Sequence, residues 1–221
     1  MTRIKRVALN MKNIKIVTDA AKEAARVLER GGVIVYPTDT VYGLGANALN
    51  GAAVRRVFAI KGRFTTKPLP VAVARIAMAR RIAIVSKSTG RFLAKIWPGA
   101  VTVILPCRRK LSLAVGGSNS IGVRQPDHLF TRALFAHINF PITATSANIA
   151  GKASANDIQS FLRQFTGKKH KPDLIIDGGK LPRRKPSTVI DLTKEKPAVV
   201  RKGAVSVKKI FGLLKNISKQ V

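Results

Sequence analysis

The sequence predicts a single α/β domain in which helices flank a twisted sheet of mixed or mostly antiparallel strands. Short apolar runs rich in β-branched residues alternate with amphipathic helical segments along the whole chain. The 221 residues are 46% hydrophobic, which is enough to bury a full-size core. Because no repeat or low-complexity linker interrupts the pattern, we expect a basic arm at residues 1–13, one domain over 14–204, and a helix with a tail at 205–221.

Local signals define the elements in order. The basic, weakly patterned residues 1–13 predict a loosely ordered arm, and Asp19 is a candidate N-cap for a helix over 20–30. An apolar run predicts a buried strand at 33–36, and a hydroxyl-rich turn at 37–45 follows it. The remaining expected helices cover 51–61, 89–97, 127–138, 158–165 and 207–214, and the remaining strands cover 69–74, 101–105, 121–124, 174–177, 188–192 and 198–200.

The cysteine content and the hydropathy pattern indicate a cytoplasmic protein. Cys107 is the only cysteine, so an internal disulfide is excluded and a reducing compartment is expected. No apolar run approaches the roughly 18 residues of a membrane span, and the basic start is not followed by the apolar core of a signal peptide.

The charge of the chain is extreme. There are 41 Lys and Arg residues against 10 Asp and Glu residues, which gives a net charge of +31 and a pI near 11.6. Such a field favours polyanions such as RNA and small phosphorylated ligands. A general basic bias, with most of the charges merely solvated, explains the same composition, and both interpretations stay open.

Several common sites are absent from the sequence. There is no G-x-x-x-x-G-K-[ST] segment, and the glycines at 43 and 45 lack the third glycine of a dinucleotide-binding loop. The three histidines are scattered without ligand spacing, so we predict no metal site made purely by protein side chains.

Cations and hydroxyl groups instead gather at the predicted ends of elements. Lys61 and Arg63 flank a glycine at a helix end, where a polyphosphate can approach. Ser146 and Asn148 are two residues apart, so in an extended stretch both point to one face. Arg124 ends an apolar strand and suits a carboxylate. Solvated helix ends and ordinary turns are the simpler interpretations of each signal taken alone.

Taken together and in order, these residues resemble the YrdC family of L-threonylcarbamoyladenylate synthases. The resemblance extends over roughly residues 15–203. The matching segments are 36–45 (YPTDTVYGLG), 61–63 (KGR), 67–69 (KPL), 97–102 (WPGAVT), 123–124 (VR), 145–148 (TSAN), 187–191 (STVID) and 201–203 (RKG).

The resemblance implies a fold built around a wide, positively charged cavity, in the single-domain form. It also implies a nucleotidyltransferase that makes threonylcarbamoyl-AMP and diphosphate from L-threonine, bicarbonate and ATP, with ATP as a substrate that carries Mg²⁺. A partner transferase complex would then move the threonylcarbamoyl group to the adenosine beside the anticodon of tRNA. Direct binding of tRNA through the basic surface is a further expectation.

The resemblance also implies roles for particular residues. Many family members have a histidine where this chain has Ala72, so one expected threonine contact is missing here. The implied catalytic residues are Lys61, Arg63, Ser146 and Asn148. The implied ATP-binding residues are Arg63, Lys67, Ser120, Ser146, Ser154 and Arg201. The implied threonine-binding residues are Thr40, Arg124, Ala144 and Ser187.

Two other function classes remain as alternatives. A non-catalytic protein that binds double-stranded RNA or assists ribosome maturation would account for the charge, although the aromatic content is only 5%. A carbamoyl-transfer maturation domain is the third interpretation. Such domains occur in longer chains with metal-binding cysteines, and the single cysteine argues against it.

Overall fold

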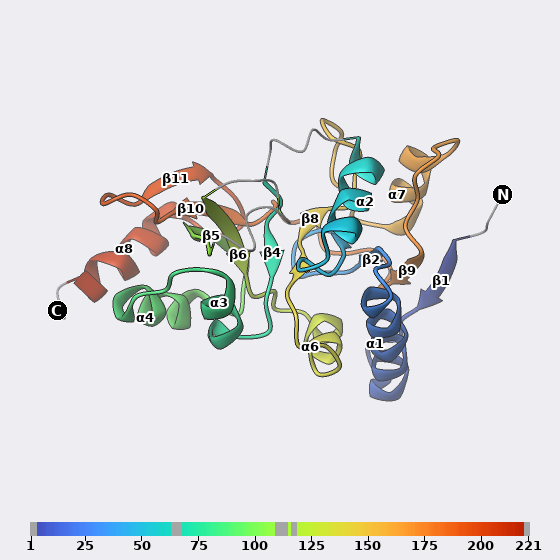
Figure 1. Cartoon of the computed structure of the whole chain (residues 1–221), viewed down its shortest axis with the longest axis horizontal. Coiled ribbons are helices and arrows are strands. Elements are labelled where there is room, and N and C mark those ends of the chain that lie inside the picture. Colours follow the sequence, from blue (N-terminus) through green and yellow to red (C-terminus); the bar gives the residue numbers. More distant parts are fainter. Residues whose placement is uncertain (1–3, 63–67, 109–114, 116–118, 219–221) are drawn as a thin grey trace.

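Two mixed β-sheets, where one was expected, organise the protein (Figure 1). The computed structural model describes residues 4–62, 68–108, 115 and 119–218. The five-stranded sheet has the order β1-β9-β2-β3-β8, with β1 (Lys5–Ala8), β2 (Ile34–Tyr36), β3 (Gly43–Gly45), β8 (Thr145–Ser146) and β9 (Leu174–Asp177). The six-stranded sheet has the order β11-β10-β5-β6-β4-β7, with β4 (Val71–Ala72), β5 (Val101–Pro106), β6 (Ser120–Arg124), β7 (Ile142–Thr143), β10 (Thr188–Asp191) and β11 (Ala198–Arg201).

The helices divide between the two sheets, as Figure 1 shows. Helices α3 (Ile76–Ile82), α4 (Lys87–Ile96) and α8 (Val207–Ser218) accompany the six-stranded sheet and share one hydrophobic core with it. The five-stranded sheet is covered on both faces. Its helices are α1 (Ile14–Glu29) and α6 (Leu129–Phe135) on one face and α2 (Gly51–Lys61) and α7 (Ile158–Phe165) on the other.

Alternation along β2 explains this double cover. Ile34 and Tyr36 enter the core under α1 and α6, whereas Val33 and Val35 enter the core under α2 and α7. Successive side chains of a strand point to opposite faces, so a strand that is covered on both faces is apolar at every position. The apolar run 33–36 is therefore the sequence signature of this central strand.

The N-terminal arm was predicted wrongly in part. Within residues 1–13, strand β1 pairs in parallel with β9 and extends the five-stranded sheet. Helix α1 also begins earlier than expected, because Asn13 accepts hydrogen bonds from the backbone N–H groups of Lys15 and Ile16. Asp19 lies inside the helix and pairs with Lys15 at 3.0 Å on the surface. A side-chain cap needs a residue with extended backbone, and Asn13 supplies it.

The expected turn at 37–45 ends in a strand. Strand β3 pairs antiparallel with β2, and its two glycines have no positive φ. A Cβ at Gly45 would lie 2.8 Å from Cε1 of Tyr36, and one at Gly43 would lie 3.0 Å from the same atom. The glycines are therefore required by the buried ring of Tyr36 packed against them, and not by turn geometry.

Other boundaries differ from the expectations. Residues 76–82, which showed no clear pattern, form α3, and the strand expected over 69–74 is reduced to β4. The helix expected over 127–138 is α6, which is shorter and is capped by His128, since its Nδ1 accepts from the backbone N–H of Phe130 at 3.2 Å. Helix α8 extends to residue 218. Within the described ranges, none of the helices is both long and apolar enough to cross a bilayer.

Candidate active site

The candidate site is a cavity of about 760 Å³ whose walls come from both sheets and from the end of α2. That volume suits a ligand of nucleotide size. Arg63 and Lys67 lie outside the described residues. Every other predicted site residue lines this cavity: Thr40, Lys61, Ser120, Arg124, Ala144, Ser146, Asn148, Ser154, Ser187 and Arg201.

Lys61 is held by the loop that carries Ser146 and Asn148. Helix α2 ends at Lys61 because Gly62 adopts the left-handed conformation, with φ of 56°. Only 3% of Lys61 is exposed, and its Nζ donates to the carbonyl oxygens of Ser146 and Asn148 and, at 3.2 Å, to Asn148 Oδ1. The Ser146 hydroxyl also donates to Asn148 Oδ1. The lysine charge is thus stabilised by neutral oxygens on this side, and it remains as positive charge in the cavity wall.

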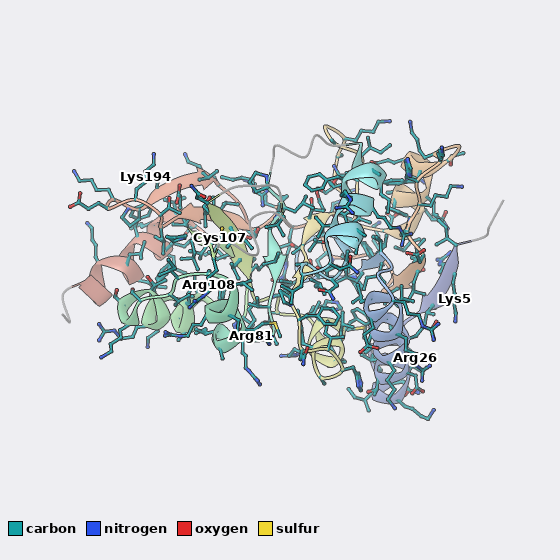
Figure 2. The ribbon with its side chains drawn as sticks, viewed as in Figure 1. Lys5, Arg26, Arg81, Cys107, Arg108 and Lys194 are labelled. Atoms are coloured by element: carbon teal, nitrogen blue, oxygen red, sulfur yellow. The ribbon has the colours of Figure 1, made fainter. Side chains whose placement is uncertain are left out.

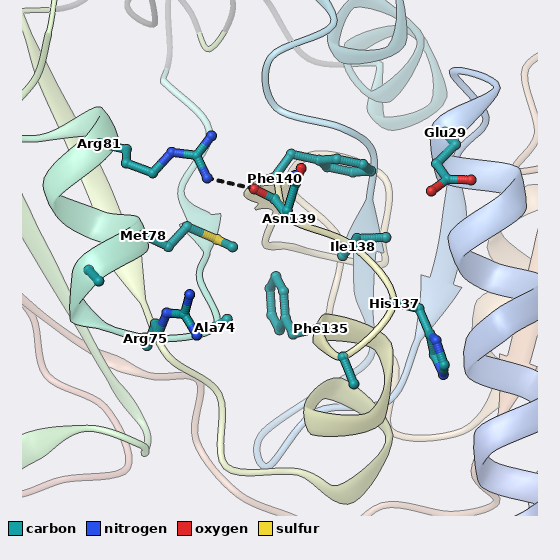
Figure 3. Close-up of a pocket in the computed structure, with 12 residues that line it drawn as sticks. Glu29, Ala74, Arg75, Met78, Arg81, Phe135, His137, Ile138, Asn139 and Phe140 are labelled. Atoms are coloured by element: carbon teal, nitrogen blue, oxygen red, sulfur yellow. Dashed lines mark hydrogen bonds between the residues drawn. The ribbon is translucent and has the colours of Figure 1, made fainter.

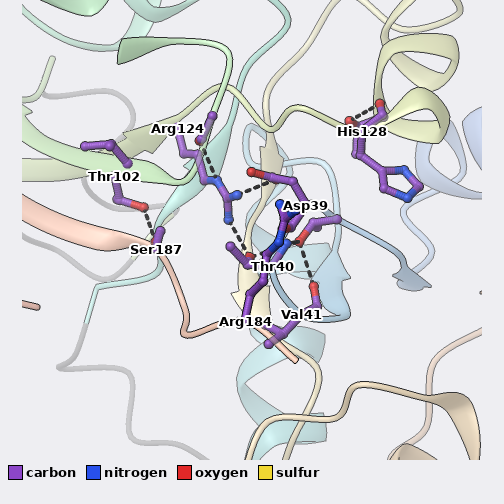
Figure 4. A network of polar contacts seen from close by, with 12 residues as sticks. Asp39, Thr40, Val41, Thr102, Arg124, His128, Arg184 and Ser187 are labelled. Carbon is purple, nitrogen blue, oxygen red and sulfur yellow. Dashed lines mark hydrogen bonds and ion pairs between the residues drawn. The ribbon is translucent and has the colours of Figure 1, made fainter. Parts of the chain in front are cut away.

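Arg124 is the centre of a second network, which is shown in Figure 4. It forms an ion pair with Asp39 in which the two side chains are 9% and 8% exposed. Its Nη1 donates to Thr40 Oγ1 at 3.0 Å and its Nε donates to the carbonyl oxygen of Gly99 at 3.2 Å. Arg184 reaches the backbone oxygen of Asp39 at 3.5 Å. The strand end of β6 is thereby tied to the segment that follows β2.

A third group joins Thr102, Ser187 and Arg201. The hydroxyl oxygens of Thr102 and Ser187 are 2.7 Å apart, and Arg201 donates to the carbonyl and hydroxyl oxygens of Ser187. Burial, and secondarily the charge of Arg124, lowers the pKa of Arg201 from its ordinary value. Two guanidinium groups therefore face one cavity closely enough to repel each other.

The charges of this wall favour anions. Among the described residues that line the cavity, Lys61, Arg124 and Arg201 are charged and none is acidic. Asp39 lies behind Arg124 and offsets one positive charge. The described part of the chain holds no group of three His, Cys, Asp or Glu residues suited to a metal ion. The charges of the lining residues thus suit a multiply charged anion.

Asp39 was predicted only as one of the residues of the turn at 37–45 that can bond the backbone or a ligand, and Thr102 had no predicted role. The available signal for Asp39 was a lone carboxylate in a hydroxyl-rich turn, just after an apolar strand in a very basic chain. Ala72, which stands where many relatives have histidine, is fully buried in the core beneath α1 and α6. It is not among the residues that line the cavity.

A second cavity of about 500 Å³ lies between α3 and the segment that connects α6 to β7 (Figure 3). Met78 and Phe135 line it, and Arg81 donates to the carbonyl oxygen of Asn139 at 2.8 Å. None of the predicted site residues lines this second cavity.

The surplus of basic side chains is spread over the molecule. Figure 2 shows Lys5 and Arg26 on the half that contains α1, and Arg81, Arg108 and Lys194 on the half that contains the six-stranded sheet.

Burial raises the pKa of the Cys107 thiol, which makes this cysteine a poor nucleophile.

Comparison with known proteins agrees with the sequence motifs. The family model Sua5_yciO_yrdC, described as "Telomere recombination", matches residues 26–203. A threonylcarbamoyl-AMP synthase of Pyrococcus abyssi is 38% identical over 189 residues, which are 85% of this chain and 55% of the relative. One of Bacillus subtilis is 36% identical over 195 residues, 87% of this chain and 56% of the relative. The chain therefore spans about half the length of these two relatives.

Solved structures show the same fold. The crystal structure of P. abyssi Sua5 complexed with L-threonine matches with a TM-score of 0.84 and 33% identity, over 96% of this chain and 61% of that one. The structure of Escherichia coli YciO matches with a TM-score of 0.77 and 28% identity, over 95% of this chain and 100% of that one. By the family model, the relatives and the shared fold, the chain belongs to the Sua5/YciO/YrdC family.

Proposed function

We propose that the protein is a threonylcarbamoyl-AMP synthase, a nucleotidyltransferase that converts L-threonine, bicarbonate and ATP to threonylcarbamoyl-AMP and diphosphate. The observation that carries this proposal is the cavity wall itself, in which the buried cations Lys61 and Arg124 and the more exposed Arg201 meet serine, threonine and asparagine side chains, without an acidic lining residue among those described. Such a wall suits a carboxylate and a polyphosphate together.

The proposed reaction needs positioning and charge neutralisation, and it needs no protein nucleophile. The amine of threonine and bicarbonate form a carbamate with loss of water. A carbamate oxygen then attacks the α-phosphorus of ATP, and diphosphate leaves. Arg124 would bind the threonine carboxylate beside Thr40, Ala144 and Ser187. Lys61 and Arg201 would stabilise phosphate charge together with Arg63 and Lys67.

The assignment of residues divides the cavity into two parts. Ser120, Ser146 and Ser154 would bind ATP, and Asn148 would keep Lys61 and Ser146 in place through the contacts described above. The described lining residues include no carboxylate, so Mg²⁺ would be held by oxygens of the nucleotide. It would supply charge neutralisation at the phosphates.

We place the product in tRNA modification. A mixed anhydride of this kind is an activated acyl donor, which a partner transferase complex would use on the adenosine beside the anticodon. A protein of this role would work in the cytoplasm, which agrees with a single cysteine.

The test is diphosphate release from ATP, Mg²⁺ and bicarbonate, measured with and without L-threonine and with L-serine as a control. We expect release that depends on threonine and is lost in Arg63→Ala. Arg124→Ala should raise the KM for threonine by about tenfold or more, because a charged hydrogen bond is lost. Arg132→Ala is the matched control, since Arg132 pairs with Asp127 on the surface with side chains 62% and 51% exposed. An unchanged threonine KM in Arg124→Ala would contradict the assignment.

A second function is favoured by the spread of basic side chains over both halves of the molecule. A protein that binds double-stranded RNA without catalysis would show salt-sensitive RNA binding and no threonine-dependent release of diphosphate. Salt-sensitive binding of tRNA by an active enzyme would instead support direct contact with the RNA that receives the product.

A further inference from the structure

We propose that Asp39 and Thr38 are positioning residues that orient Arg124 and Thr40 toward the amino acid substrate. Neither Asp39 nor Thr38 is among the residues that line the cavity, whereas Arg124 and Thr40 are. The inference rests on the proposed function and extends it to two residues that do not touch the ligand.

The contacts of Arg124 fix the plane of its guanidinium group. Of its five N–H donors, one bonds the carbonyl oxygen of Gly99, one bonds Thr40 Oγ1 and one bonds Asp39 Oδ1. The three acceptors come from two segments of the chain, residues 39–40 and Gly99, so a rotation of the guanidinium would break at least one bond. Two N–H groups of Arg124 bond none of the described residues, and a carboxylate that binds bidentately requires two N–H donors.

Asp39 also counteracts a repulsion within the cavity wall. Arg201 faces the same cavity, and the charge of Arg124 contributes to lowering the pKa of Arg201. Without the carboxylate of Asp39, the buried guanidinium of Arg124 would lose its ion pair, while Arg201 would still face the same cavity. The guanidinium of Arg124 would then lose an attraction that holds it in place.

Thr38 determines the direction of the hydrogen bonds at Thr40. The single hydroxyl hydrogen of Thr38 is donated to the carbonyl oxygen of Val41 at 2.7 Å. In the 3.1 Å contact between the two hydroxyl groups, Thr40 must therefore be the donor. Thr40 Oγ1 accepts a hydrogen bond from Arg124. Because its hydrogen is already donated to Thr38, its remaining lone pair can only accept a hydrogen bond from a ligand.

Arg124 thus presents N–H donors beside the acceptor oxygen of Thr40. The two N–H groups of Arg124 that bond no described residue suit a carboxylate, and the oxygen of Thr40 suits an N–H or O–H group on the same small molecule. An α-amino acid presents these two kinds of group a few bonds apart. Asp39 and Thr38, which do not line the cavity, therefore determine where this part of it presents hydrogen-bond donors and acceptors.

The experiment compares Asp39→Asn, which keeps the shape and removes the charge, with Thr38→Val. We expect the KM for L-threonine to rise about tenfold or more in Asp39→Asn, and about threefold to tenfold in Thr38→Val, as for loss of a charged and a neutral hydrogen bond. The KM for ATP should stay unchanged, and this difference separates positioning from general loss of structure. Asp127→Asn is the matched control, because it removes an exposed carboxylate that also pairs with an arginine.

A second measurement does not depend on the reaction. The side-chain Nε–H resonance of Arg124 in ¹⁵N-labelled protein, assigned by its loss in Arg124→Lys, should broaden or shift in Asp39→Asn. An unchanged resonance with an unchanged threonine KM would overturn the proposal. If the wild-type protein shows no threonine-dependent release, the proposed function fails, and the resonance still decides whether Asp39 orients Arg124. If Asp39→Asn does not fold, an unchanged threonine KM in Thr38→Val overturns the proposal.

Discussion

The contact between Gly45 and the ring of Tyr36 allows a sharp test of the fold around the cavity. In Gly45→Ala the new Cβ would lie 2.8 Å from Cε1 and 3.1 Å from Cδ1 of Tyr36, and 3.2 Å from Cγ1 of Ile34. Carbon atoms pack without strain at roughly 3.5–4.0 Å. The ring cannot retreat easily, because Tyr36 is fully buried and its hydroxyl donates to the carbonyl oxygen of Thr143 at 3.2 Å.

The expected size of the effect follows from two opposing contributions. Overpacking a core costs about 1–3 kcal/mol, and replacing glycine where the backbone tolerates alanine returns about 0.4–1 kcal/mol. We therefore expect Gly45→Ala to lose about 1–2 kcal/mol of unfolding free energy, or roughly 2–8 °C in Tm for a domain of this size. Strand β3 also pairs with β8 through Gly43 and Ser146, so the displacement would reach the cavity.

The assay is urea denaturation followed by circular dichroism, with Gly51→Ala as the control. A Cβ at Gly51, the first residue of α2, meets only Arg55 Nη1, at 3.5 Å, so this variant should be as stable as the wild type or up to about 1 kcal/mol more stable. If Gly45→Ala were as stable as Gly51→Ala, the reasoning that assigns the glycine to the ring of Tyr36 would be refuted.

Two further predictions concern hydrogen bonds. Thr102→Val keeps the shape of a residue that is 5% exposed but removes its 2.7 Å bond to Ser187, so unfolding in urea should show a loss of about 1 kcal/mol, and an unchanged midpoint would contradict the bond. Asp157 caps α7, and its hydrogen bond from the backbone N–H of Ser160 holds the pKa of the carboxyl below its usual range. Its stabilising effect is present above the unfolded pKa of about 3.9 and is lost as the pH falls through the lower folded pKa. The difference in unfolding free energy between the wild type and Asp157→Asn should thus shrink in acid, and a difference that is constant between about pH 6 and pH 2 would contradict the assignment.

The longer elements could be predicted from the sequence, and the contacts between distant segments could not. In α1 the apolar spacing of Ala21, Ala24 and Leu28 identifies the buried face. Ser154 and Asp157 fit a local capping pair before α7, and of the two it is Asp157 that caps the helix. Strands β3, β4, β7 and β8 have only two or three residues each, which is too short for any periodicity to appear. Their existence depends on partners elsewhere in the chain, so the division into two sheets was not predictable.

The same distinction holds for the candidate site. Hydroxyl and basic residues at element ends indicated which segments to examine, and the family motifs gave individual residues. The pair of Asp39 and Arg124 joins positions 85 residues apart in sequence. A single sequence contains no information on that pairing, because an ion pair of this kind has no local pattern. The direction of the hydrogen bonds at Thr40 likewise emerges only when every acceptor is in place.

The position of β1 at the end of the five-stranded sheet bears on the solubility of the protein. One side of β1 pairs with β9, and among the described strands none pairs with its other side. An open strand edge can recruit the same edge of another molecule and so begin aggregation. Lys5 and Arg6 lie on this strand, and each pairs with a carboxylate, Lys5 with Glu23 and Arg6 with Asp177. Strand β11, at the end of the other sheet, is followed by Lys202. Charged side chains on an edge strand oppose such pairing between copies. That opposition weakens when the ion pairs and the repulsion are screened, because salt shortens the range of charge interactions to about 10 Å or less.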